Sequence, residues 1–266
     1  MLFVPLAMLL SWYPALLALA GVEASGINPL GPLAAALIVL GITVGRDGVK
    51  DLLRRMITFK AAPRWYAFAV LLPALMVGTA AAIAVALGAQ MDVQVNAEEL
   101  ALRVAFFMFF VSLGEEPGWR GYLLPMLRKR HGLLAASLLL GVVWSIWHIP
   151  VMFEEFPPSI LPAFVINVLA ASVVLAWLYE HSGGNIVVCM VLHTAVNAIG
   201  AGAVFQWFAG DSLVMLWWVY TALWTSLAVA IGWHMRTAGA SDVGTLALQV
   251  DRSADAVRVA QPVRLG

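Results

Sequence analysis

Long hydrophobic runs separated by short polar turns dominate the chain. Several runs reach the roughly 20 residues that a helix needs to cross a hydrocarbon core about 30 Å thick, and they hold almost no charge. The turns between them carry helix breakers such as Asn28-Pro29, Pro157-Pro158 and Gly183-Gly184. The runs lie at about 2–20, 27–45, 65–89, 100–127, 132–153, 160–180, 184–206 and 212–234. This pattern predicts an all-α membrane bundle of about eight transmembrane helices.

Composition supports a membrane protein. The chain is 62% hydrophobic and 11% charged, with a mean hydropathy of +0.91, whereas soluble domains carry roughly 25% charged residues. We expect one transmembrane domain over residues 1–236 and a polar, disordered tail over 237–266. A net charge of zero argues against nucleic acid as a partner. The single Cys189 excludes an intrachain disulfide and a multi-cysteine metal cluster.

The distribution of charge predicts the orientation, because Lys and Arg in short loops collect on the cytoplasmic side. All Lys and Arg residues except Arg103 and Arg120 lie between runs two and three, between runs four and five, or after run eight. The opposite loops carry acidic residues only, so both termini should be cytoplasmic. The first run could instead be a cleaved signal peptide ending at Ala18-Leu19-Ala20, although no Lys or Arg precedes it.

Run four contains the densest group of ionisable residues. Such groups cost at least about 2.5 kcal/mol each at membrane depth, which makes them functional candidates. Glu116 and Arg120 stand four residues apart on one helical face and can pair. Glu115 points about 100° away from them, following helical geometry. The two carboxylates should therefore differ in proton affinity, which would give one site a structural anion and a general base.

Runs five and seven each add a histidine. Trp144 and His148 are four residues apart, and so are His193 and Asn197. A single intramembrane His can be a packing residue, and an Asn can simply hydrogen-bond between helices, as we expect for Asn167 in run six. The combination of carboxylates, imidazoles and an amide on three runs favours a catalytic site. His148 lies nearer the outer face than the others, which a tilted or kinked run five would reconcile.

These three motifs resemble the signatures of the CPBP (CAAX protease and bacteriocin-processing) family of intramembrane peptidases: Glu-Glu-x-x-x-Arg, aromatic-x-x-x-His and His-x-x-x-Asn. The resemblance covers roughly residues 100–200. One departure is Trp144, where the family often has Phe, and we expect it to affect packing more than chemistry. Another is Pro117-Gly118, which should loosen the helix after the glutamates.

The resemblance implies which residues form the site: Glu115, Glu116, Arg120, His148, His193 and Asn197. Glu115 with His148 would activate the attacking water, and the Glu-Arg pair would support it. The His-x-x-x-Asn motif would polarise the scissile carbonyl and stabilise the oxyanion. We therefore expect an endopeptidase acting on a peptide or a membrane-associated protein, located in a prokaryotic plasma membrane.

Three alternatives stay open at this point. Members of the family are commonly called metalloproteases, and Glu115, His148 and His193 could form an open Zn²⁺ site, but a metal-free glutamate mechanism is equally compatible with the sequence. The ionisable groups could also serve a proton- or cation-coupled transporter, although no internal repeat is visible. A non-catalytic scaffold or immunity protein is the third. The substrate, including any prenylated CAAX protein, and the oligomeric state are not readable from the sequence.

Overall fold

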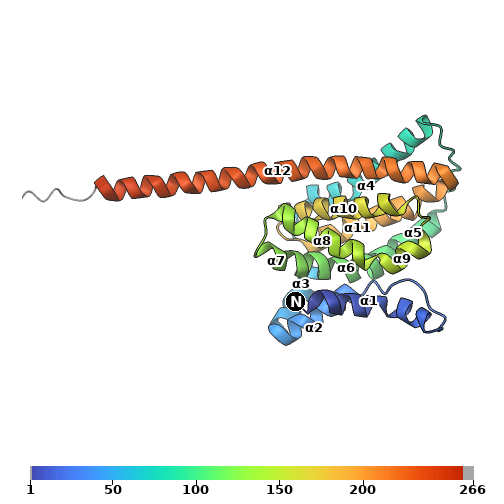
Figure 1. Ribbon diagram of the computed structural model, residues 1–266, viewed down its shortest axis with the longest axis horizontal. Coiled ribbons are helices and arrows are strands. Elements are labelled where there is room, and N and C mark those ends of the chain that lie inside the picture. The colour runs from blue at the N-terminus through green and yellow to red at the C-terminus, as the bar shows by residue number, and fades with distance from the viewer. Residues whose placement is uncertain (1, 260–266) are drawn as a thin grey trace, which may run out of the picture.

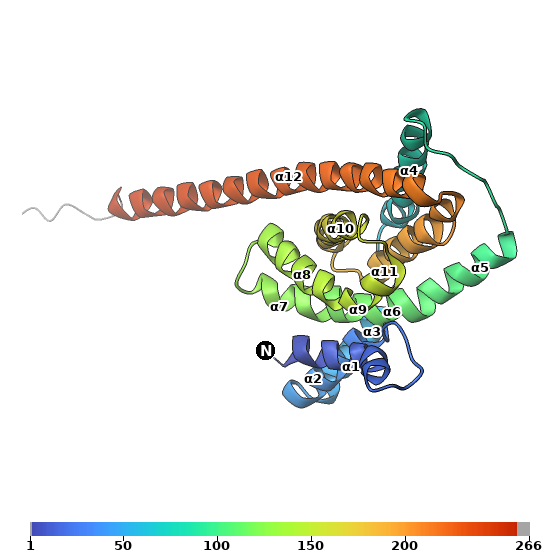
Figure 2. The same ribbon diagram turned by 45° about the vertical axis from the view of Figure 1, so that its right-hand side comes forward.

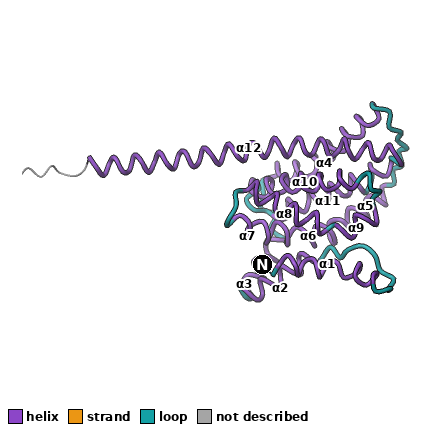
Figure 3. Tube along the Cα trace, viewed as in Figure 1, coloured by secondary structure: helices purple, strands orange, loops and turns teal. Residues whose placement is uncertain are grey.

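The computed structural model describes residues 2–259, with side chains described for residues 2–236. Within that range the chain forms helices and no strands, which confirms the predicted all-α class (Figure 3). The elements in chain order are α1 Phe3–Leu19, α2 Gly31–Thr43, α3 Arg46–Met56, α4 Pro63–Ala86, α5 Ala97–Phe106, η1 Phe107–Ser112, α6 Leu113–Gly118, η2 Trp119–Leu123, α7 Leu124–Arg128, α8 Leu133–Trp147, α9 Ile149–Glu155, α10 Leu161–His181, α11 Ile186–Ala195, η3 Val196–Ala201, η4 Val204–Trp207 and α12 Gly210–Val259.

Each predicted hydrophobic run contains a helix or several consecutive helices. Run four corresponds to the continuous segment from α5 to α7, and run five corresponds to α8 and α9. The basic segment between runs two and three, which the hydrophobic pattern leaves as a connection, also folds as a helix, the amphipathic α3. Leu52 on this helix is buried, whereas Arg46, Lys50 and Arg54 are exposed.

The protein is an integral membrane bundle. Four helical segments are long and apolar enough to cross a membrane: 63–86, 161–181, 186–207 and 210–236. The pair α8 and α9 makes a fifth if the two helices form one bent span, while α1 and α2 are shorter apolar helices. The total of about eight spans and the cytoplasmic position of both termini stay predictions.

The helices α1 and α2 lie on one side of the molecule and α12 on the other, with α6, α8, α10 and α11 between them (Figures 1 and 2). α12 continues past Arg236 through residues 237–259, where the sequence predicts a polar tail. Residues 260–266 of that tail lie outside the described residues. The division of the chain into two parts at residue 236 stays a prediction.

Glycines allow α2 to lie directly against α6, the helix that carries both glutamates. A Cβ added at Gly114 would lie 2.3 Å from the carbonyl oxygen of Pro29, and one added at Gly118 would lie 2.6 Å from the carbonyl of Pro32. Real side chains do not tolerate such distances. The helix that carries both glutamates therefore has its glycine face against the backbone of α2 and of the turn before it.

Three short π-helices lie beside or contain motif residues. η1 and η2 lie immediately before and after α6, and η3 begins directly after α11 and contains Asn197. Pro117 lies inside α6, where it removes a helical hydrogen-bond donor, as expected from its position in the sequence. Single-turn π segments within α-helices often occur at functional sites because they redirect side chains.

A bend occurs at His148. The axes of α8 and α9 differ by 56°, and His148 is the residue between them. Pro150 stands in the first turn of α9, where its missing N–H costs no helical hydrogen bond. The predicted kink in run five is confirmed, and it explains how His148 reaches the other motif residues despite its position near the end of the run.

Candidate active site

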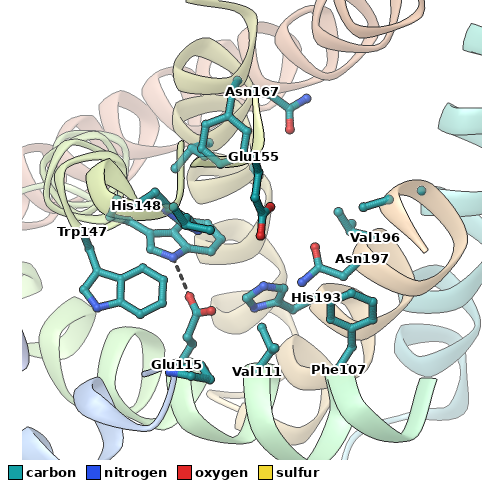
Figure 4. A pocket seen from close by; sticks show the side chains of 18 of the residues that line it. Phe107, Val111, Glu115, Trp147, His148, Glu155, Asn167, His193, Val196 and Asn197 are labelled. Atoms are coloured by element: carbon teal, nitrogen blue, oxygen red, sulfur yellow. Dashed lines mark hydrogen bonds between the residues drawn. The ribbon is translucent and has the colours of Figure 1, made fainter. Parts of the chain in front are cut away.

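A cavity of about 440 Å³ lies among α6, α8, α10, α11 and η3 (Figure 4). Its wall includes Glu115, His148, His193 and Asn197, which come from all three sequence motifs. Most of the remaining wall is apolar or aromatic. The structure therefore brings these predicted residues around one space, and Glu116 and Arg120 lie behind that wall rather than in it.

Glu116 and Arg120 form the predicted ion pair. Both side chains are fully buried, and Arg120 Nη1 lies 2.8 Å from Glu116 Oε1. The same oxygen is 2.7 Å from Nδ1 of His193. Because a carboxylate oxygen accepts, Nδ1 of His193 is the donor, and Glu116 fixes the orientation of that imidazole. Because both side chains are buried, each charge depends on the other: either one alone would carry a large desolvation cost.

The hydrogen-bond partners of Glu115 are tryptophans, whereas Arg120 is paired with Glu116. Oε2 of Glu115 accepts a hydrogen bond of 2.6 Å from Trp144 Nε1 and one of 3.2 Å from Trp119 Nε1. Both bonds are buried, and both use the same oxygen. Trp144 therefore does more than pack, because a Phe at this position could not donate the shorter bond, while its effect on the chemistry stays a prediction.

His148 is oriented by its own helix. Its Nδ1 lies 2.8 Å from the backbone carbonyl oxygen of Trp144, which can only accept, so Nδ1 carries the proton and Nε2 has the free lone pair of the neutral ring. Aromatic rings surround the imidazole: the centroid of Trp147 is 4.8 Å away and that of Phe164 is 5.3 Å away. Its rotamer is thus fixed by packing as well as by a hydrogen bond.

Asn197 is half-buried and lines the cavity near His193 (Figure 4). Asn167 and Glu155, which lie outside the motifs, also line it. Asn167 is 9% exposed, and its Nδ2 has no hydrogen-bond partner in the described part of the chain, so the expected interhelical hydrogen bond from this amide is not found. Glu155 lies at the end of α9 on the cavity wall, while Glu154 beside it accepts a hydrogen bond of 2.8 Å from the backbone N–H of Gly26.

Sequence reasoning missed two supporting residues. Trp119 stands four residues after Glu115, the same spacing that predicted the Glu116–Arg120 pair, so its indole could have been found by the same rule. Arg55 on α3 donates to the carbonyl oxygen of Gly121 at 3.2 Å and to the hydroxyl of Tyr179 at 2.5 Å. No sequence signal separates Arg55 from the other basic residues of this segment.

The predicted metal ligands, Glu115, His148 and His193, all line the cavity. Among the described residues, no group of three or more His, Cys, Asp or Glu side chains is arranged to hold a metal ion. Nδ1 of His148 is engaged by a backbone carbonyl and Nδ1 of His193 by Glu116, which leaves Nε2 of each ring. Metal-ligating histidines usually hold their other ring nitrogen in this way, so these bonds are compatible with a metal-bound site and with a metal-free one. Metal dependence stays a prediction.

A buried carboxylate facing a cavity, with two oriented imidazoles inside a membrane helical bundle, is an arrangement that an intramembrane hydrolytic site would need. The comparisons agree with this class. The model of the family described as type II CAAX prenyl endopeptidase Rce1-like matches residues 97–199, which confirms the CPBP/CAAX resemblance over the segment that carries all three motifs. Both the family and the curated match below are proteases.

A curated relative, "CAAX prenyl protease 2" from Methanococcus maripaludis, is 31% identical to this chain over 103 residues. The aligned stretch covers 35% of this chain and 38% of the relative, so the chain matches well under half of the relative's length. The likeness therefore concerns the α5–η3 core and not the helices around it.

Proposed function

We propose that the protein is an intramembrane endopeptidase that hydrolyses a peptide bond with a water molecule activated by Glu115 and His148. The observation that carries this proposal is the single cavity lined by both groups together with His193 and Asn197. The match of residues 97–199 to the model of a peptidase family supports it. The enzyme would act on a peptide or on a segment of a membrane-associated protein, in the plasma membrane of a prokaryote.

Two acceptors would hold the attacking water. Oε2 of Glu115 is occupied by two indole donors, which leaves Oε1 to accept one proton of the water. Nε2 of His148 accepts the other, because Nδ1 already donates to a backbone carbonyl. With both protons directed at acceptors, an oxygen lone pair of the water faces the substrate carbonyl carbon. This arrangement is that of general base catalysis.

Two donors would stabilise the oxyanion. His193 donates through Nδ1 to Glu116, and in its imidazolium form Nε2–H would be a charged donor to the oxyanion. The carboxamide of Asn197, one helical turn further along, supplies a second N–H. Donors held by fixed partners need no reorganisation when charge develops, which is the main advantage of an oxyanion site.

The bond changes follow from these positions. The water oxygen bonds to the carbonyl carbon while one water proton moves to Glu115, and the carbonyl oxygen becomes the oxyanion. The carbon–nitrogen bond then breaks, and Glu115 returns its proton to the leaving amine. The products are a carboxylic acid and an amine, and Glu115 is again ionised.

We propose that protein groups alone carry out these steps, which is supported by the finding that no group of three or more His, Cys, Asp or Glu among the described residues is arranged to hold a metal ion. Zn²⁺ would supply Lewis acidity if it were bound. The first test includes a chelator, 1,10-phenanthroline, with and without added Zn²⁺. Unchanged activity supports a metal-independent mechanism, and loss of activity that Zn²⁺ restores overturns it.

The test of function is cleavage of quenched fluorescent peptides by detergent-purified protein. The panel should contain apolar transmembrane-like peptides and a prenylated CAAX peptide, the substrate class that the relative's name states. We expect Glu115→Gln and His148→Ala to lower kcat by about 10²- to 10⁴-fold, the usual contribution of a general base. The matched controls are Glu98→Gln and His131→Ala, both exposed and outside the cavity wall.

Cleavage that survives both site substitutions would overturn the assignment and favour a transporter or a scaffold. Cleavage of the prenylated peptide alone would identify the substrate class, and cleavage of the unmodified apolar peptides would show that prenylation is not required.

A further inference from the structure

Trp144 lies at the centre of the candidate site. Its Nε1–H donates the shortest buried hydrogen bond to Glu115, at 2.6 Å. Its ring also contacts three other site residues: the guanidinium carbon of Arg120 is 4.4 Å from the ring centroid, and the imidazoles of His193 and His148 are 5.4 and 5.6 Å away. The side chain is 4% exposed, so these contacts are shielded from solvent.

The indole bond restricts the carboxylate of Glu115. A Glu side chain has three rotatable bonds, and a carboxylate facing a cavity without a partner would sample several orientations. The Trp144 and Trp119 donors converge on Oε2 from two different helices. The other carboxylate oxygen points toward the space beside His193 (Figure 4). The two indoles thereby select the orientation in which Oε1 is available to a water molecule.

We infer that Trp144 is a positioning residue for Glu115, acting through its indole N–H. This inference rests on the proposed function. The ring and the N–H have separable roles, because the ring stacks with Arg120 and fills the space between the histidines, while the N–H alone holds the carboxylate. A Phe at this position would keep much of the ring packing and lose the donor.

The longer bond from Trp119 makes a smaller contribution. At 3.2 Å it lies at the weak end of the range for N–H···O bonds, and Trp119 belongs to the same helical segment as Glu115. A hydrogen bond to a charged group contributes about 1.5–3 kcal/mol. For Trp144 this corresponds to a loss of kcat of about 10- to 100-fold on removal of the N–H, and Trp119→Phe should lose less.

The experiment compares Trp144→Phe with Trp144 replaced by 3-benzothienylalanine, which keeps the bicyclic ring and substitutes sulfur for N–H. We expect both variants to lose kcat by about 10- to 100-fold with KM within about twofold of wild type. Trp224→Phe is the matched control, because Trp224 is also fully buried and lies outside the cavity wall. Its kcat should stay within about twofold of wild type.

A benzothienylalanine variant with wild-type kcat would overturn the inference, because the ring alone would then account for the role of Trp144. A rise in KM without a fall in kcat would also overturn it, since that result indicates a contact with substrate.

A second measurement is independent of peptidase activity. Infrared difference spectra locate the carboxyl band of Glu115, which is assigned by its disappearance in Glu115→Gln. That band should shift in Trp144→Phe and stay in place in Trp224→Phe. An unshifted band in Trp144→Phe overturns the inference even if no substrate is found, whereas a shifted band in a protein that cuts no peptide supports the inference and counts against the proposed function alone.

Discussion

Replacing Arg120 by Met tests how the charges behind the cavity support one another. Removing one partner of a buried ion pair costs about 3–5 kcal/mol, because the other charge stays buried without compensation. Glu116 Oε1 also accepts a bond from His193, so this carboxylate keeps one partner when Arg120 is lost. We therefore expect Arg120→Met to lower the free energy of unfolding by about 3 kcal/mol, the lower end of that range.

The reverse substitution should cost more. Glu116→Gln leaves Arg120 without an anion, and its Nε and Nη2 already lack hydrogen-bond partners among the described residues. We expect a cost of about 5 kcal/mol. The double variant leaves neither charge, so its cost should be well below the sum of the two single costs.

Reversible unfolding in mixed micelles of dodecyl maltoside and SDS measures these free energies. Two results would refute the reasoning: a larger cost for Arg120→Met than for Glu116→Gln, or additive costs in the double variant. A larger cost for Arg120→Met would mean that His193 does not compensate the charge of Glu116, and additive costs would mean that the 2.8 Å contact does not couple the two charges.

Further predictions concern packing and the oxyanion. Gly118→Ala should destabilise the protein by about 1–3 kcal/mol in the same unfolding assay, because its Cβ would lie 2.6 Å from the carbonyl of α2; Gly78→Ala, which meets nothing within 4 Å, is the control. Asn197→Ala should lower kcat by about 10²- to 10³-fold in the peptide assay with unchanged unfolding, as for loss of one oxyanion donor. Tyr179→Phe should cost about 1 kcal/mol of stability, because the phenol accepts a bond from Arg55.

Much of the fold follows from run length, because an apolar stretch in lipid must form a helix to satisfy its backbone. This reasoning does not find α3, whose charges suggest a loop. That helix depends on the burial of Leu52 and on the contacts of Arg55 with Gly121 and Tyr179, which are visible only after other helices are in place.

In the site too, contacts within one helix can be predicted from the sequence, whereas contacts between helices cannot. The Glu116–Arg120 pair joins residues four apart on one helix, so helical geometry alone predicts it. The bond from Trp144 to Glu115 joins separate helices, and so does the bond from His193 to Glu116. Their partners depend on how the helices pack, and one sequence does not determine which nitrogen meets which oxygen.

Because of the bend at His148, one hydrophobic run supplies the cavity wall with residues from two helices of different direction. The distal helix of the pair ends at Glu155 on the cavity wall, and the proximal helix carries the carbonyl of Trp144 that orients the ring. A substitution that straightened this bend would therefore move Glu155 relative to His148, while the hydrogen bond that orients the imidazole would stay within α8 and its cap.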